Sequence, residues 1–171
     1  MTPDFEDLLS HLNAEGAQYL IIGGYAVSVH AQPRATKNLD IFIGTNRENG
    51  AAVWRALARF GAPVADIPPH EMAEPDTFFT WGNPPFRVDI ITQISGIAFD
   101  EAWSRHLLHI VNESTGLTAP FISAEDLITN KQASGLGGGR LYDLADAEAV
   151  RQAIEARRRG ARGEVPREPE A

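Results

Sequence analysis

YLIIGGYAVSVHAQPRATKNLDIFI, residues 19–43, contains two short apolar runs separated by a glycine pair and a polar segment. Both runs are rich in β-branched and aromatic residues, so we interpret them as buried strands. The glycine pair, Gly23 and Gly24, opens a predicted short helix between them. The second run carries one acid, Asp40, between apolar neighbours. A carboxylate in a dry interior is costly unless it is paired or binds a metal, so Asp40 marks a candidate site.

A second apolar run with a single acid follows later in the chain. FRVDIITQI carries Asp89 between apolar residues, in the same arrangement as Asp40. Successive side chains of a strand point to opposite faces, so each acid lies on the face away from its neighbours. If the two strands are adjacent, both carboxylates reach one sheet surface and can bind Mg²⁺ together with substrate phosphates. Ion pairs with Arg34 or Arg87 are the alternative, and spacing alone does not separate the two.

The other elements are predicted from periodicity, caps and turn residues. Apolar periodicity predicts helices in TPDFEDLLSHLNAEG, TNRENGAAVWRALARFG, FISAEDLITNKQAS and RLYDLADAEAVRQAIEARRR, and at the start of AFDEAWSRHLLHI. Thr45 and Ser123 are the expected N-caps of two of these helices. TFFTW is expected to form a hairpin with FRVDIITQI. The proline-rich segment 62–76 is expected to be a loop or mobile flap, and His30 a packing residue at a helix end.

Composition and length indicate one α/β (α+β) domain. The 171 residues contain no cysteine, which excludes disulfides and thiolate metal sites. We expect a mixed β-sheet core over residues 1–122, C-terminal helices closing a cleft over 123–158, and a disordered tail over 159–171. No apolar run approaches the roughly 20 residues that span a bilayer, and the N-terminus is unlike a signal peptide. A cytoplasmic protein without a membrane partner is expected, and the net charge of −8 argues against broad nucleic-acid binding.

Four pieces of the chain together match a known pattern: IIGGYAVSVH, PRATKNLDIFI, FRVDIIT and EDLITNKQASGLGGGRLYDLADAEAV. In the last piece a lysine precedes an Arg-x-x-Asp-x-x-Asp segment. The combination resembles the nucleotidyltransferase core of the DNA polymerase β superfamily. The resemblance is to its small prokaryotic members, which include nucleotidyltransferase toxins of abortive-infection (type IV) toxin–antitoxin systems. It covers roughly residues 18–150 and implies a nucleotidyltransferase-like sheet flanked by helices.

The resemblance also implies roles for the residues of the two strands. Gly23 and Gly24 would hold the triphosphate of an NTP through backbone N–H groups, as the start of a helix can. Asp40 and Asp89 would hold Mg²⁺ or Mn²⁺, with Asp89 nearest the attacking hydroxyl. On its own, a glycine pair more often marks only a tight strand-to-helix connection.

Residues outside the two strands receive roles from the same resemblance. Lys131 would approach the phosphates, Asp143 would line the same cleft, and Arg34 and Thr36 would brace the strand of Asp40. Each has a structural alternative. Lys131 could be a solvated helix lysine, Asp143 a first-turn acid that favours the helix dipole, and Arg34 an ion-pair partner.

Asn38 departs from the pattern, which has an acid at this position. Its amide oxygen can still bind a hard cation, so Asn38 is a candidate metal ligand, but its charge is gone. One metal could suffice, or another acid such as Glu71 or Glu74 could replace the missing one. The third account is a fold that binds nucleotide without turnover.

The expected activity is transfer of a nucleotide from an NTP to a hydroxyl of RNA, protein or a small molecule. Such an enzyme could be the toxin of a pair, with an antitoxin as partner. The alternative is a catalytically degenerate nucleotide- or partner-binding module of the same fold, and a third reading is a scaffold with salt-bridged acids. The sequence does not specify the NTP, the acceptor or the oligomeric state.

Overall fold

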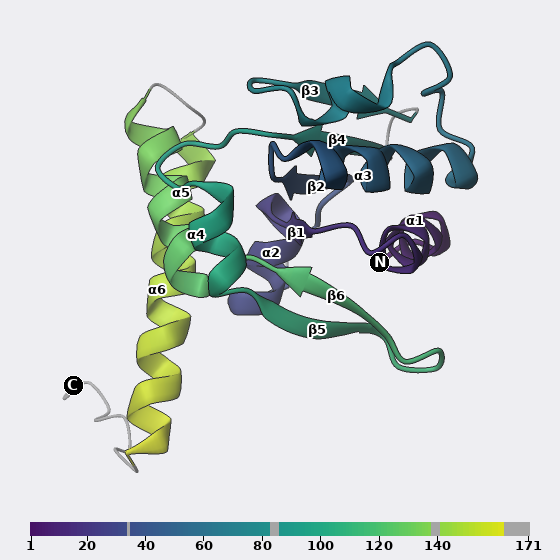
Figure 1. The fold of residues 1–171 in the computed structure, drawn as a ribbon. Coiled ribbons are helices and arrows are strands. Elements are labelled where there is room, and N and C mark those ends of the chain that lie inside the picture. The colour runs from purple at the N-terminus through teal and green to yellow at the C-terminus, as the bar shows by residue number, and fades with distance from the viewer. Residues whose placement is uncertain (34, 83–85, 138–140, 163–171) are drawn as a thin grey trace, which may run out of the picture.

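The chain forms a mixed six-stranded sheet with helices packed around it (Figure 1). The computed structural model describes residues 1–33, 35–82, 86–137 and 141–162. Within these residues the order of elements is α1 (Pro3–Ala14), β1 (Tyr19–Ile21), α2 (Gly23–His30), β2 (Asn38–Ile43), α3 (Arg47–Phe60), a 3-10 helix η1 (Pro69–Ala73), β3 (Phe78–Trp81), β4 (Arg87–Ile91), α4 (Phe99–Ser104), β5 (Leu107–Asn112), β6 (Leu117–Phe121), α5 (Ala124–Leu136) and α6 (Leu141–Ala161). The predicted α/β class with a mixed sheet is confirmed.

The centre of the sheet brings the two acid-bearing strands together. The strand order is β3-β4-β2-β1-β6-β5, with β1 antiparallel to β2 and β2 parallel to β4. Asp40 of β2 lies directly opposite Asp89 of β4. Register partners on adjacent strands share a face, so the prediction of one sheet with both acids on one face is confirmed. The first strand was expected over residues 18–23 and is shorter, Tyr19–Ile21, because Ile22 is the N-cap of α2 and Gly23 its first residue.

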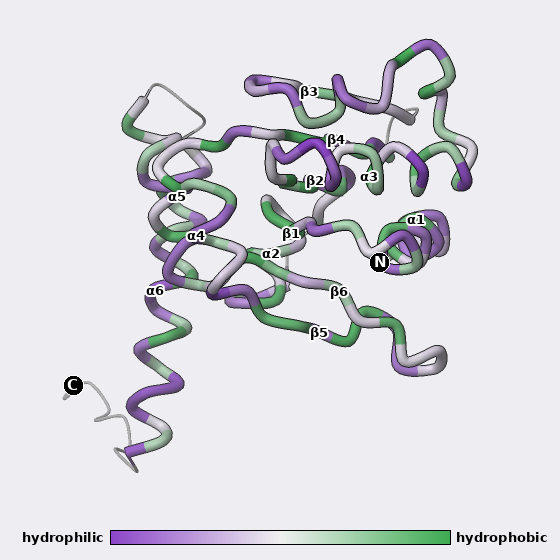
Figure 2. Tube along the Cα trace, in the orientation of Figure 1, coloured by the Kyte–Doolittle hydropathy of each residue, from purple (hydrophilic) through white to green (hydrophobic). Residues whose placement is uncertain are grey.

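Two hairpins complete the sheet. β3 pairs antiparallel with β4, as predicted, and their connecting residues 83–85 lie outside the described residues. The hairpin of β5 and β6 was not predicted; its strand β6 joins the sheet by parallel pairing of Phe121 with Ile21. β5 is the sheet edge, and Leu107, Leu108 and Ile110 on it are at least half exposed. Figure 2 shows this edge strand as a largely hydrophobic stretch.

α1 and α3 pack against each other beside the sheet. The buried face of α1 consists of Phe5, Leu8, Leu9 and Leu12. The capping prediction for α3 was wrong: its N-cap is Asn46, whose side chain accepts from the N–H of Asn49, and not Thr45. Because α3 begins at Arg47, Asn46 is the residue immediately before the helix and takes the N-cap position.

The proline-rich segment is a loop, as predicted, but it is anchored on α3. Met72 and Ala73 of η1 are buried. The indole N–H of Trp54 donates to the carbonyl oxygens of Val64 (3.2 Å) and Ile67 (2.7 Å). The loop is therefore packed against the helix rather than extended as a flap.

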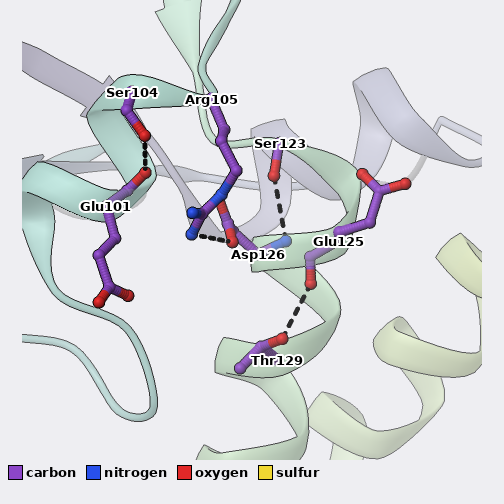
Figure 3. A network of polar contacts seen from close by, with 7 residues as sticks. All are labelled: Glu101, Ser104, Arg105, Ser123, Glu125, Asp126 and Thr129. Atoms are coloured by element: carbon purple, nitrogen blue, oxygen red, sulfur yellow. Dashed lines mark hydrogen bonds and ion pairs between the residues drawn. The ribbon is translucent and has the colours of Figure 1, made fainter.

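The first turn of α5 is tied to the end of α4 (Figure 3). Ser123 caps the helix as predicted, accepting from the N–H of Asp126 (3.1 Å). The guanidinium of Arg105 holds the carboxylate of Asp126 at two points, with Nε at 3.1 Å and Nη2 at 2.8 Å. Because Asp126 is buried, this fork fixes the helix that carries Lys131 further along.

α6 packs along α5, and both contact α2 (Figure 1). It continues to Ala161, so residues 159–161 are helical instead of part of a disordered tail. Residues 163–171 lie outside the described residues. In the described part of the chain, no helix combines the length and apolar character needed to cross a bilayer.

Candidate functional site

One polar pocket collects the seven residues that were predicted to bind the metal or the nucleotide. It has a volume of about 300 Å³ and lies between the sheet and the pair α5–α6. The predicted residues that line it are Gly23, Gly24, Asn38, Asp40, Asp89, Lys131 and Asp143. Ala35, Thr36, Lys37, Tyr142 and Asp146 complete the lining. The structure thus brings the residues together, while their roles stay predictions.

We call the residues Asn38, Asp40 and Asp89 the sheet wall of this pocket. Asp89 is buried, with 5% of its surface exposed. Its Oδ1 accepts from the hydroxyl of Thr80 on β3. Its Oδ2 lies 3.4 Å from both the amide nitrogen of Asn38 and Nη2 of Arg87. The ion pair that was the alternative for Asp89 is therefore present, and the carboxylate still lines the pocket.

The Cα atoms of Asp40 and Asp89 are neighbours on adjacent strands of the sheet. Adjacent strands lie about 4.8 Å apart, so the two residues are rooted about that far from each other. The carbonyl oxygen of Asp40 accepts from the N–H of Ile22 (3.0 Å), which joins β2 to the residue just before α2. This bond holds the acid beside the glycine pair that opens the helix.

We call the residues Lys131, Asp143 and Asp146 the helix wall. Nζ of Lys131 lies 2.6 Å from Oδ1 of Asp143 and 3.1 Å from Oδ2 of Asp146. Ser134 donates to the other oxygen of Asp143 (2.8 Å). Lys131 is only 9% exposed. The alternative of a solvated surface lysine is therefore wrong, because burial of an ammonium needs such partners.

Thr36 lines the pocket and was expected to brace the strand that carries Asp40. Its hydroxyl donates to the carbonyl oxygen of Asn38 (3.3 Å), which braces the start of β2 as predicted. Tyr142 is 73% exposed at the rim of the same pocket. Arg34, the other expected brace, lies outside the described residues.

Neither Glu71 nor Glu74 lines the pocket, so neither replaces the acid missing at position 38. Glu74 lines a separate hollow with Thr45 and Arg47, beyond the opposite end of β2. Within the described ranges, no group of three or more His, Cys, Asp or Glu side chains is arranged to hold a metal ion. A cation at the sheet wall would thus have two carboxylates and the amide oxygen of Asn38.

Several lining or supporting residues were not predicted. Thr80 lies opposite Asp89 in the register of β3 and β4, a partnership that alternation in TFFTW could have indicated. Asp146 is the second aspartate of the Arg-x-x-Asp-x-x-Asp segment but was given no role, and its spacing of three from Asp143 places both on one helix face. Lys37 and Tyr142 carry no sequence signal that separates them from ordinary surface residues.

Acids outnumber cations on the pocket lining. Four carboxylates, those of Asp40, Asp89, Asp143 and Asp146, face two ammonium groups, Lys37 and Lys131. A larger hollow, of about 550 Å³ between α1 and the β5–β6 hairpin, contains none of the predicted residues. The smaller pocket is therefore the candidate site, and its charge suits a cation or a cation-bound anion.

Comparison with known proteins does not assign this site. No protein-family model matches the chain, and no curated protein matches it at significant similarity. The geometry of the pocket is therefore the basis for a functional proposal.

Proposed function

We propose that the protein is a metal-dependent nucleotidyltransferase that moves a nucleotide from an NTP to a hydroxyl acceptor. The observation that carries the proposal is the pairing of Asp40 with Asp89 at a pocket shared with the glycine turn of α2. Two carboxylates on adjacent strands form a rigid pair of oxygen ligands. The start of α2 offers backbone N–H groups to an anion beside them.

The residues of the sheet wall fit Mg²⁺ or Mn²⁺ in ligand type. Asp40 and Asp89 would hold the cation, and the amide oxygen of Asn38 is a neutral third ligand. When bound, the metal activates the attacking hydroxyl and stabilises the leaving oxygens. The excess of carboxylates on the lining supports this, because a free triphosphate would be repelled without a cation.

The side chains of the pocket then have separate tasks. The N–H groups of Gly23 and Gly24 would bind triphosphate oxygens, and Lys131 would orient them from the helix wall. Asp89 would lie nearest the hydroxyl that attacks the α-phosphorus. The new bond joins the acceptor oxygen to the α-phosphorus, the bond from that phosphorus to the β-phosphate oxygen breaks and releases pyrophosphate, and the hydroxyl proton passes to solvent.

Incubation with each labelled NTP, Mg²⁺ or Mn²⁺, and total RNA or cell protein tests the proposal. Label should pass to an acceptor with the wild type and fail to do so with Asp40→Asn and Asp89→Asn. Absence of transfer to every acceptor class, together with absence of Mn²⁺ binding, would overturn the proposal.

A catalytically degenerate nucleotide- or partner-binding module is the second candidate. The hydrogen bond between Asn38 and Asp89 favours it, because a neutral amide occupies the place of a third charge. Such a module would bind an NTP with Mn²⁺ in equilibrium dialysis and return it unchanged, with no pyrophosphate released.

The narrower version of the enzyme proposal is a cytoplasmic toxin that is countered by an antitoxin. Induced expression should then arrest bacterial growth, and Asp89→Asn should relieve the arrest while the protein accumulates normally. Arrest that persists in the Asp89→Asn variant would separate any toxicity from nucleotide transfer.

A further inference from the structure

The carboxylate of Asp40 lies in the space where a side chain on residue 23 would be. The N–H of Ile22 donates to the carbonyl of Asp40, so the main chains of the two segments are held together next to Gly23. A Cβ atom built on Gly23 would lie 1.9 Å from Oδ2 of Asp40 and 2.8 Å from its Cγ. No real pair of atoms approaches so closely without a bond. The carboxylate therefore occupies the space that a side chain at position 23 would fill.

The backbone at Gly23 adds a second constraint. Its φ is +63°, in the left-handed region that favours glycine. Gly16, in the turn before β1, has φ +67° but has no atom within 4 Å of a Cβ built on it. The two glycines thus share a backbone conformation, and only Gly23 has a carboxylate in the place of its side chain.

We propose that Gly23 is a positioning residue for Asp40: its missing side chain is the space that lets the carboxylate face Asp89 and the pocket. The inference rests on the proposed function, since Asp40 matters here as a metal ligand. This positioning role is separate from the proposed binding of phosphate by the backbone N–H of residue 23. The Gly23→Ala substitution keeps that N–H and removes only the space for the carboxylate.

A methyl group at position 23 moves the side chain of Asp40 rather than the sheet. The closest atoms to the added Cβ are the end of that side chain, whereas its Cβ is at 3.1 Å. Rotation about the Cα–Cβ bond of Asp40 moves its Oδ2 and Cγ out of contact with the added methyl group, and we expect it to displace the carboxylate from its place in the pocket. Shared coordination by Asp40 and Asp89 is lost while the strands stay paired.

Titration with Mn²⁺ alone, without nucleotide, tests the role. Free Mn²⁺ is followed by electron paramagnetic resonance in the wild type, Gly23→Ala, the matched control Gly16→Ala, and Asp40→Asn. We expect Gly23→Ala to weaken Mn²⁺ binding about 10–100-fold, as far as Asp40→Asn does. Gly16→Ala should bind Mn²⁺ as the wild type does.

The outcomes separate this inference from the function on which it rests. Wild-type-like Mn²⁺ binding by Gly23→Ala overturns the positioning role and leaves the proposed function standing. A wild type that binds no Mn²⁺ overturns both, because Asp40 is then no metal ligand.

Unfolding of the metal-free protein gives an independent readout. Both variants carry the backbone penalty of a positive φ, and only Gly23→Ala adds a clash with Asp40. Gly23→Ala should therefore lower the midpoint denaturant concentration more than Gly16→Ala does. Most of that excess should disappear in the Asp40→Ala background, even if Gly23→Ala alone is too unstable to bind metal. An equal loss in both backgrounds would mean that the carboxylate does not set the requirement for glycine.

Discussion

The two walls of the pocket hold their charged groups in opposite ways. On the sheet wall, the carboxylate of Asp89 is held by two neutral donors and by Arg87, whose side chain is 41% exposed. On the helix wall, the buried ammonium of Lys131 lies between two carboxylates. The ion pairs of the helix wall join side chains that are all buried, whereas the ion pair of Asp89 on the sheet wall is made with a partly exposed arginine 3.4 Å away. From this difference we expect substitutions on the helix wall to act mainly on stability and substitutions on the sheet wall to act mainly on metal binding.

The largest effect should come from breaking the helix wall with Lys131→Met. Removal of the ammonium leaves Asp143 and Asp146 buried against each other, which should cost about 3–5 kcal/mol of unfolding free energy. Urea denaturation of the metal-free protein measures it. Lys37→Met is the matched control, because Lys37 lines the same pocket but is exposed, and it should cost less than about 1 kcal/mol. Similar losses in both variants would contradict a structural helix wall.

Asn38→Asp sharpens the contrast by adding charge to the sheet wall. Affinity for Mg²⁺ should rise about 10–100-fold, by analogy with changes in metal shells. The metal-free protein should become less stable, because the new carboxylate repels Asp89. Calorimetric titration and thermal melting of the same samples check the two signs. An unchanged affinity would place Asn38 outside the coordination shell.

Asp89→Asn should change the stability of the metal-free protein by less than about 1 kcal/mol, because the arginine left behind is 41% exposed and can be solvated by water. The variant keeps an oxygen acceptor for Thr80 and relieves repulsion between neighbouring carboxylates, so a slight gain is the expected sign. Mn²⁺ binding should nonetheless be lost. A fall of several kcal/mol with Mn²⁺ binding retained would make Asp89 a structural partner of Arg87.

The smallest effect concerns His30, which links the end of α2 to the segment just before α5. His30, at the end of α2, donates from Nε2 to the carbonyl of Ile122 (2.7 Å), just before the cap of α5. Burial lowers the pKa of His30 from its ordinary 6.5, against a smaller opposing contribution from that hydrogen bond. The unfolded chain therefore takes up a proton more readily, so stability should fall as the pH drops below about 6.5.

His30→Gln, which keeps an N–H donor, isolates this effect. The difference in unfolding free energy between pH 7.5 and pH 5.5 should be smaller in the variant than in the wild type. Arg157, Glu125 and His109 also act on His30, and they are present in both proteins. The same pH dependence in both proteins would assign it to other groups.

The acid-bearing strands and their shared face were predictable because each apolar run contains a single aspartate between apolar residues. Alternation in a strand then determines which side that charge takes. Short stretches of sequence also sufficed to predict three further features: the glycine turn, the hairpin of β3 and β4, and the cap at Ser123. His30 was predicted as a packing residue at a helix end, and it is the buried last residue of α2.

The hairpin of β5 and β6 escaped prediction for physical reasons. The sequence of β5, LLHIVN, has no alternation of polar and apolar residues that marks a half-buried strand, although its first four residues are exposed. β6 contains Pro120, which argues against a strand between two others. Proline is tolerated because β6 pairs with β1 only at Phe121. The buried partners of Lys131 depended on how α6 packs along α5, which is long-range information.

The topology also sets when the pocket can form. Asn38 and Asp89 are 51 residues apart, and His30 meets Ile122 across 92 residues. Parallel pairing of β2 with β4 needs a long connection, and the helix wall comes from the last two helices. Closing such loops slows folding, because their entropy is lost before their contacts form. A chain emerging from the ribosome therefore lacks the complete lining of this pocket until α6 has been synthesised, since Tyr142, Asp143 and Asp146 all lie on that helix.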